Sequence, residues 1–360
     1  MVTIDHVANL AGVSKATVSR VINQRGNVSA DTVRMVRDAM TRAQYAAPLP
    51  KPTRSQGTDG IRTNGATLSA YALLVPEMSN GLYSSLLRGF EAAAQAQYHQ
   101  MIVCNTADNV YKQGDDILQL IHKKVSGVAI VPVASATTPL SHIETLENAG
   151  IPVVLLHRDV PNATTPLVAL PLEGAGYYAG RTLLACGHRR VALFTSADSA
   201  SANLHRKGFE RALAEQDADL PDYRVCLCPF IRPFSVSTLE LCVDAALDRL
   251  WSMPEHERPT AIYVTADVIA EALFMRLLSR GISIPNDVSV LGFGTAQRDG
   301  VITSRLSAVV VDELAIGKTA VEFLEQSRKS RNGDDYDTDR LTRNADLSLA
   351  EGETLAHRNM

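Results

Sequence analysis

The sequence has no apolar run of membrane-spanning length, and it is poor in aromatic residues. Aromatic side chains make up 5% of the 360 residues, with a single tryptophan. A membrane-spanning helix needs about 20 consecutive, mainly apolar residues, so a helical membrane protein is excluded. The Met-Val-Thr-Ile start continues directly into a helical pattern and lacks the apolar core of a secretory signal. We therefore expect a cytoplasmic protein.

The five cysteines lack the spacing of a metal site or a disulfide framework. They are odd in number, and Cys226-Leu-Cys228 in a strand would only place two thiols on one face. The nine histidines do not pair with Cys, Asp or Glu at metal-ligand spacing. We expect no metal ion, no cofactor, and five reduced, mostly buried thiols, with a redox sensor as the alternative. The cysteines are Cys104, Cys186, Cys226, Cys228 and Cys242.

The formal net charge of -4 hides a strong asymmetry along the chain. Residues 1–62 hold nine Lys and Arg against four Asp, a net charge of +5, which leaves -9 for the rest. Only the N-terminal part therefore suits a polyanion such as DNA. The remainder is long enough for one or two larger domains, and 46% of all residues are apolar, as expected of a globular protein.

The first 45 residues have the pattern of a helix-turn-helix followed by a third helix. Gly12 permits a left-handed turn, Ser14 is placed to cap the second helix, and Ser29 to cap the third. Three short amphipathic helices joined in this way enclose one small core. The expected inner faces are Ile4, Val7, Ala8 and Leu10, then Val18, Val21 and Ile22, then Val33, Val36, Met40 and Tyr45.

The outer face of the second helix carries hydroxyls, an amide and two cations, which suit the DNA major groove. The alternative is a helical cap with an incidental polar face. Lys15, Ala16 and Arg20 begin this helix or lie one turn along it, so we expect them at base edges, with Arg20 reading guanine. Short donors near helix ends are expected to hold phosphates: Thr3, Ser14, Thr17, Ser19, Asn23, Asn27, Ser29 and Thr32.

These residues resemble the headpiece of LacI/GalR-family transcriptional repressors. The resemblance implies a sequence-specific regulator that binds a roughly palindromic DNA operator as a homodimer. It is carried by Thr3-Ile4, Val7-Ala8, Ala11-Gly12-Val13-Ser14, Thr17-Val18-Ser19-Arg20-Val21, Asn23 and Val28-Ser29.

Residues 47–69 are predicted to be a linker between the headpiece, residues 1–46, and the core. In the family this region forms a hinge helix on the operator. The alternating prolines Pro48, Pro50 and Pro52 favour an extended chain over a helix here. Nearby Lys and Arg side chains either follow phosphates or belong to a solvated tether, and both readings stay open.

From residue 70 the pattern alternates between apolar strands and amphipathic helices, which predicts an α/β fold with parallel sheets. The same segments resemble the two-lobed, periplasmic-binding-protein-like core of the family. We expect lobe 1 at about 70–167 and 298–326, and lobe 2 at about 168–297 and 327–360. Family members dimerise through the core, and Leu82–Tyr98 and Val268–Leu278 are candidate interface helices. The resemblance is carried by Val75-Pro76, Ser79-Asn80, Arg88-Gly89, 125–128, 150–154, 187–191, Lys207-Gly208-Phe209, Pro259-Thr260-Ala261, 284–293 and Gly317.

An enzyme is the main alternative of a different class, but no catalytic constellation supports it. The glycines from Gly174 to Gly180 resemble a dinucleotide turn only superficially, because no clean strand precedes them. The densest polar cluster, His157-Arg158-Asp159, offers no nucleophile with a base. A transport-type binding module would need a signal peptide. We therefore expect a regulator and no enzyme.

The effector site is where the sequence departs from the family. Sugar- and purine-responsive members carry polar side chains at positions that read His205, Ala266, Gly294 and Pro171-Leu172 here. A polyol needs several convergent hydrogen-bonding groups. We expect that common neutral sugars neither bind nor release the protein from DNA, and an effector-independent regulator is the alternative. The residues left at matching positions, which suit an anion or an aromatic ligand, are Leu82, Tyr83, Arg158, His205, Arg206 and Asp267.

Overall fold

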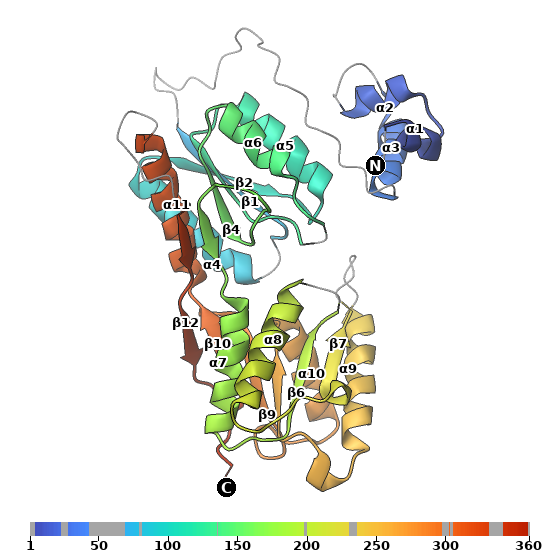
Figure 1. The fold of residues 1–360 in the computed structure, drawn as a ribbon, viewed down its shortest axis with the longest axis vertical. Helices are drawn as coiled ribbons and strands as arrows, with labels where there is room; N and C mark the ends of the chain where they lie inside the picture. The colour runs from blue at the N-terminus through green and yellow to red at the C-terminus, as the bar shows by residue number, and fades with distance from the viewer. Residues whose placement is uncertain are drawn as a thin grey trace. The chain divides into compact units, whose positions relative to one another are not determined.

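The computed structural model contains a three-helix headpiece and two α/β sheets (Figure 1). By contacts the chain divides into two compact units: Met1–Met78, Glu91–Leu167 and Ala320–Leu341 in the first, and Ser79–Phe90, Val168–Thr319 and Thr342–Met360 in the second. The predicted linker lies outside the described residues except for Ser69. The structure describes residues 4–22, 28–42, 69–78, 81–134, 136–197, 200–229, 236–296, 302, 305–330 and 341–358.

The headpiece consists of α1 (Ile4–Ala11), α2 (Lys15–Ile22) and α3 (Ala30–Arg42). Its core centres on Val7, Val18 and Val36, which are fully buried. Gly12 adopts a φ of +64°, so the predicted left-handed turn between α1 and α2 is confirmed. The expected inner position of Leu10 is wrong, because its side chain is 47% exposed. Positions 4, 7, 8 and 11 form the inner stripe of α1, and position 10 falls outside it.

The first sheet has the strand order β11-β5-β4-β3-β1-β2. Its first four strands in chain order pair in parallel. The apolar run from Tyr71 to Val75 is fully buried, as expected of a central parallel strand. The strands are β1 (Ala70–Val75), β2 (Gln100–Asn105), β3 (Gly127–Ile130), β4 (Val153–His157), β5 (Leu167–Ala169) and β11 (Thr342–Asn344), and α4 (Gly81–Ala96), α5 (Val110–His122) and α6 (Leu140–Asn148) connect β1 to β4.

The second sheet has the order β12-β10-β9-β8-β6-β7, and helices cover both faces. Along β6, Val191 and Leu193 pack towards α7 and α8, while Ala192 and Phe194 pack towards α9 and α10. This period of two explains the continuous apolar run. The elements are α7 (Leu172–Ala185), β6 (Val191–Ser196), α8 (Ala200–Ala214), β7 (Val225–Cys228), α9 (Val236–Trp251), β8 (Ala261–Val264), α10 (Asp267–Ser279), β9 (Ser289–Thr295), β10 (Ser307–Val311) and β12 (Leu347–Ala350). The helix α11 (Glu313–Ser330) follows β10, and its Glu325 accepts a hydrogen bond from the Tyr71 hydroxyl of β1 in the first sheet.

One strand belongs to a different sheet from the one expected. Residues 308–311 lie within the segment 298–326 that is expected in lobe 1, but β10 pairs in parallel with β9 and antiparallel with β12, in the second sheet. An apolar run indicates a buried strand, but it does not identify the sheet that buries it. The C-terminal tail adds the short strand β12 to this sheet.

Gly176 and Gly180, from the run that resembled a dinucleotide turn, lie inside α7 and pack closely against α8. A Cβ on Gly176 would come 2.0 Å from the carbonyl oxygen of His205 in α8, and one on Gly208 would come 1.8 Å from that of Glu173 in α7. Only glycine allows this close approach of two helix backbones. Among the described residues, no helix is long and apolar enough to cross a membrane.

Candidate DNA interface and effector-binding residues

The described part of α2 separates a buried face from an exposed one. Val18 is fully buried, whereas Lys15, Ala16 and Arg20 are exposed. Thr17 and Ser19 are partly buried. The three residues predicted to reach base edges therefore share the outer face of a helix whose opposite side fixes it to the headpiece core.

Two serines begin helices at this surface, as predicted. Ser14 Oγ accepts a hydrogen bond from the Thr17 backbone N–H at 3.1 Å, and Ser29 Oγ accepts one from the Thr32 N–H at 3.3 Å. The side-chain hydroxyls also lie close together, at 2.9 Å for Ser14 and Thr17 and at 2.8 Å for Ser29 and Thr32. Each serine therefore caps its helix and satisfies one of the first-turn N–H groups.

Lys15, one of the predicted base-contacting residues, forms an ion pair within the headpiece. Its Nζ lies 2.9 Å from Oδ2 of Asp5 in α1, and both side chains are 60% exposed. An exposed pair of this kind contributes about 0–1 kcal/mol, so DNA can replace Asp5 at little cost. The candidates Thr3, Asn23 and Asn27 lie outside the described residues.

His205, the first candidate effector residue of the second unit, is buried and contacts two aromatic side chains. Its Nδ1 lies 2.8 Å from the Tyr263 hydroxyl, and its ring meets the Phe293 ring edge-on at 4.6 Å between centroids. Burial lowers the pKa of His205 to about 3, so the imidazole is neutral at pH 7.

Arg206, the next candidate along α8, pairs with two carboxylates. Its guanidinium donates to Glu210 Oε1 and to Asp222 Oδ1, each at 2.7 Å. Neither His205 nor Arg206 therefore supplies an uncompensated positive charge. The expectation of an anionic or aromatic ligand stays a prediction.

Asp267 lies at the start of α10, on the other side of β9 from His205. A Cβ on Gly294 would lie 2.7 Å from Asp267 Oδ2, while the neighbouring Phe293 contacts His205. Both candidates thus contact adjacent residues of β9, near its carboxyl end. Ala266, the N-cap of α10, has no side chain with which to cap it.

Hydroxyls at the carboxyl ends of these strands were missed by the sequence reasoning. Thr195 and Thr265, at the ends of β6 and β8, have their Oγ1 atoms 2.7 Å apart, and Thr295 ends β9 and is buried. Ligands of parallel α/β sheets bind beyond this edge. Threonines gave no signal because they are also ordinary strand residues.

The candidates outside the second sheet are only partly described. Arg158 follows β4, and its Nη1 donates to the Pro132 carbonyl at 2.7 Å. Tyr83 on α4 is 4% exposed. The side chain of Leu82 lies outside the described residues.

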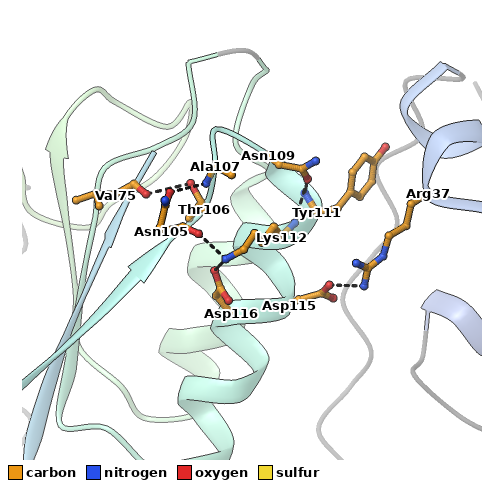
Figure 2. Close-up of polar contacts among 10 residues, drawn as sticks. All are labelled: Arg37, Val75, Asn105, Thr106, Ala107, Asn109, Tyr111, Lys112, Asp115 and Asp116. Atoms are coloured by element: carbon orange, nitrogen blue, oxygen red, sulfur yellow. Dashed lines mark hydrogen bonds and ion pairs between the residues drawn. The ribbon is translucent and has the colours of Figure 1, made fainter. Parts of the chain in front are cut away.

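The turn between β2 and α5 is polar, and its side chains are engaged in hydrogen bonds and an ion pair. Asn109 caps α5 by accepting from the N–H groups of Tyr111 and Lys112. Figure 2 shows the Lys112 ammonium donating to the Asn105 carbonyl and pairing with Asp116. Asp108 accepts from the Ala134 N–H at 2.6 Å. These groups already satisfy one another, so they hold the strand-end loop in place.

Comparison with known proteins agrees with this organisation. The family model for bacterial regulatory proteins of the lacI family matches residues 3–47, and the model for a periplasmic binding protein-like domain matches residues 168–343. The HTH-type transcriptional repressor PurR of Vibrio parahaemolyticus serotype O3:K6 is 31% identical over 333 residues, which cover 92% of this chain and 93% of that protein. The chain belongs to the LacI family of bacterial regulatory proteins.

Two further matches cover nearly the whole chain. Catabolite control protein A of Priestia megaterium is 27% identical over 326 residues, 90% of this chain and 91% of that protein. A solved structure described as the transcriptional regulator CelR–cellobiose complex has a TM-score of 0.65 at 21% identity and covers 98% of this chain and 100% of that one. This LacI-family member is thus a DNA-binding transcriptional regulator with a periplasmic-binding-protein-like core.

Proposed function

We propose that this LacI-family regulator represses transcription by binding a roughly palindromic operator as a homodimer, with α2 in the major groove. The carrying observation is the exposed face of α2 with Lys15, Ala16 and Arg20 above a buried Val18. The net positive charge of residues 1–62 supports the same proposal, because it attracts the phosphates of DNA.

A homodimer follows from the small size of one headpiece. A single α2 reaches few base edges, and helix-turn-helix proteins read two half-sites through a two-fold axis. On α10, Met275 and Leu278 are 53% and 51% exposed, which keeps this helix as a candidate interface. The second candidate, α4, remains a sequence-based assignment.

The second part of the proposal is that the core responds to no common neutral sugar. Ala266 and Gly294 offer no side-chain donor, Leu172 is buried, and His205 is already bonded to Tyr263. What remains is aromatic and hydroxyl-lined, and it suits an aromatic ligand better than a polyol. The competing proposal is a regulator that needs no effector. Either version assigns the core to regulation and no catalytic step to it.

The effector proposal is tested by calorimetry on a panel of neutral sugars, purines, and acidic and aromatic metabolites, with release from operator DNA as the second readout. We expect no heat of binding and no release with the neutral sugars. A neutral sugar that binds at micromolar affinity and lifts the protein off DNA would overturn the proposal. Release by an aromatic metabolite would support a ligand-controlled regulator, and release by none would support the effector-independent version.

A further inference from the structure

Three of the five cysteines converge in the second unit, although they are far from metal-site spacing in the sequence. Cys226 and Cys228 lie on one face of β7, and Cys242 reaches them from α9. Cys226 Sγ lies 3.8 Å from Cys228 Sγ and 4.0 Å from Cys242 Sγ, and all three sulfur atoms lie within 4.8 Å of one another. Leu227, between the first two, is 52% exposed, because alternate strand residues point to opposite faces.

These separations fit one metal ion bound by three sulfur atoms. With metal–sulfur bonds of about 2.3 Å, three thiolates around one ion are spaced about 3.8 Å apart in tetrahedral and about 4.0 Å apart in trigonal geometry. Two of the three sulfur–sulfur distances already have these values, and the third is no longer than 4.8 Å. The backbone is therefore pre-arranged for the ligands.

We propose that Cys226, Cys228 and Cys242 bind one thiophilic d10 metal ion, such as Zn²⁺, Cd²⁺ or Cu⁺, as three thiolates. Binding of a divalent ion forms three metal–sulfur bonds and releases up to three protons from sulfur to solvent, with no change in oxidation state. Thiolate ligands select ions of this soft class. The proposal is independent of the assigned effector residues.

The local charge favours a divalent ion. A divalent ion with three thiolates carries a net charge of -1. The Arg249 guanidinium, which donates to the Val225 carbonyl at 3.0 Å, supplies +1 at the start of the same strand.

The site also has access and an open position. Cys226 and Cys228 are buried among the apolar residues between β7 and α9, but Cys242 is only partly buried and provides a route from solvent. Among the described residues the group contains no fourth His, Cys, Asp or Glu. The ion is therefore three-coordinate or takes a water as its fourth ligand.

The first test titrates Cd²⁺ into the reduced, chelator-treated full-length protein and follows thiolate-to-cadmium charge-transfer absorption. We expect saturation at one ion per chain. Cys242→Ser should weaken binding at least about tenfold. Loss of a residue that only hydrogen-bonds to a metal ligand already costs about tenfold, and Cys242 is itself a proposed ligand. Cys104→Ser and Cys186→Ser, which remove thiols elsewhere, should leave the affinity unchanged. A missing band, or one that Cys242→Ser leaves unaltered, would overturn the proposal.

A second test needs no variant, which matters if a substitution in this core unfolds the protein. Cys104 and Cys242 are both only partly buried, so they serve as an internal pair for alkylation by iodoacetamide read by mass spectrometry. Saturating Cd²⁺ should slow alkylation of Cys242 and leave that of Cys104 unchanged. Equal rates with and without Cd²⁺ would contradict the proposal. A Cys242 disulfide formed by mild diamide despite saturating Cd²⁺ would identify a redox pair instead.

Discussion

At the scale of single residues, Arg20 carries the prediction that is most specific to DNA sequence. Its side chain is exposed on α2, and a guanidinium can donate twice to guanine O6 and N7. Arg20→Ala should cost about 1–3 kcal/mol at the operator and relax the preference at one base pair. Fluorescence anisotropy on operator variants and random DNA measures both effects.

The matched control for Arg20 is Arg34 on α3, an equally charged residue with a 77% exposed side chain. Arg34→Ala should weaken operator and random DNA by the same small factor, because it removes only general positive charge. Asn23→Ala should likewise weaken all sequences alike, as the loss of a phosphate contact does. Equal losses on operator and random DNA for Arg20→Ala would refute its assignment to a base.

His205 carries a prediction about pH. Burial lowers its pKa to about 3, compared with about 6.5 in an unfolded chain. The unfolded state therefore binds more protons below pH 6.5, and this residue's contribution to stability falls as the pH drops from 6.5 towards 3. Between pH 6.5 and 5 the loss is up to about 2 kcal/mol.

The pH prediction is checked by urea unfolding at several pH values. His205→Gln should flatten the pH dependence in this window, whatever its effect on stability at pH 7. His256 is a suitable control, because its side chain is 79% exposed and His256→Gln should leave the slope unchanged. An unchanged slope in His205→Gln would show that the histidine is accessible to protons in the folded state.

At the scale of elements, the contact between α7 and α8 depends on glycine. A Cβ on Gly208 would lie 1.8 Å from the backbone oxygen of Glu173, so Gly208→Ala must separate the helices. We expect a loss of about 2–3 kcal/mol, seen as a drop in Tm of about 5–10 °C. Gly174→Ala in α7 is the control, since its nearest contact would be an ordinary 3.5 Å to Leu347 Cδ1. Equal Tm values for the two variants would contradict this packing.

The sequence was sufficient to predict most elements because their signals are local. The α1–α2 turn requires Gly12, the caps require Ser14 and Ser29, and the buried strands are continuous apolar runs. The short strands β5 and β11 were missed, since three residues carry no period. Leu10 and β10 were misplaced because their final positions depend on tertiary partners.

The candidate sites divide in the same way. The outer face of α2 follows from helical periodicity alone and was predicted. The cysteine cluster depends on α9 packing against β7, and thirteen residues separate Cys228 from Cys242, so linear spacing gave no indication of it. The charge state of His205 depends on burial beside Tyr263, which the sequence did not indicate.

At the scale of the whole molecule, recognition of a two-fold operator requires two copies of the chain on DNA. Light scattering at micromolar concentration should give the mass of a homodimer. A double variant that places lysines at the exposed apolar positions Met275 and Leu278 of α10 should shift it towards the monomer. Leu204→Lys, at a 41% exposed position of α8, is the control. A dimer unaffected by the α10 variant would exclude that helix, and a monomeric mass with one-to-one half-site binding would overturn the dimer itself.

The central claim is that this chain recognises a particular DNA sequence through α2. The most direct measurement selects bound genomic fragments with the purified protein and then compares affinity for the recovered site with that for its scrambled version at one fixed salt concentration. We predict a site with two related half-sites and a preference of at least about 10³-fold. Equal affinity for the recovered and scrambled sequences, or recovery of fragments that share no sequence, would contradict the account.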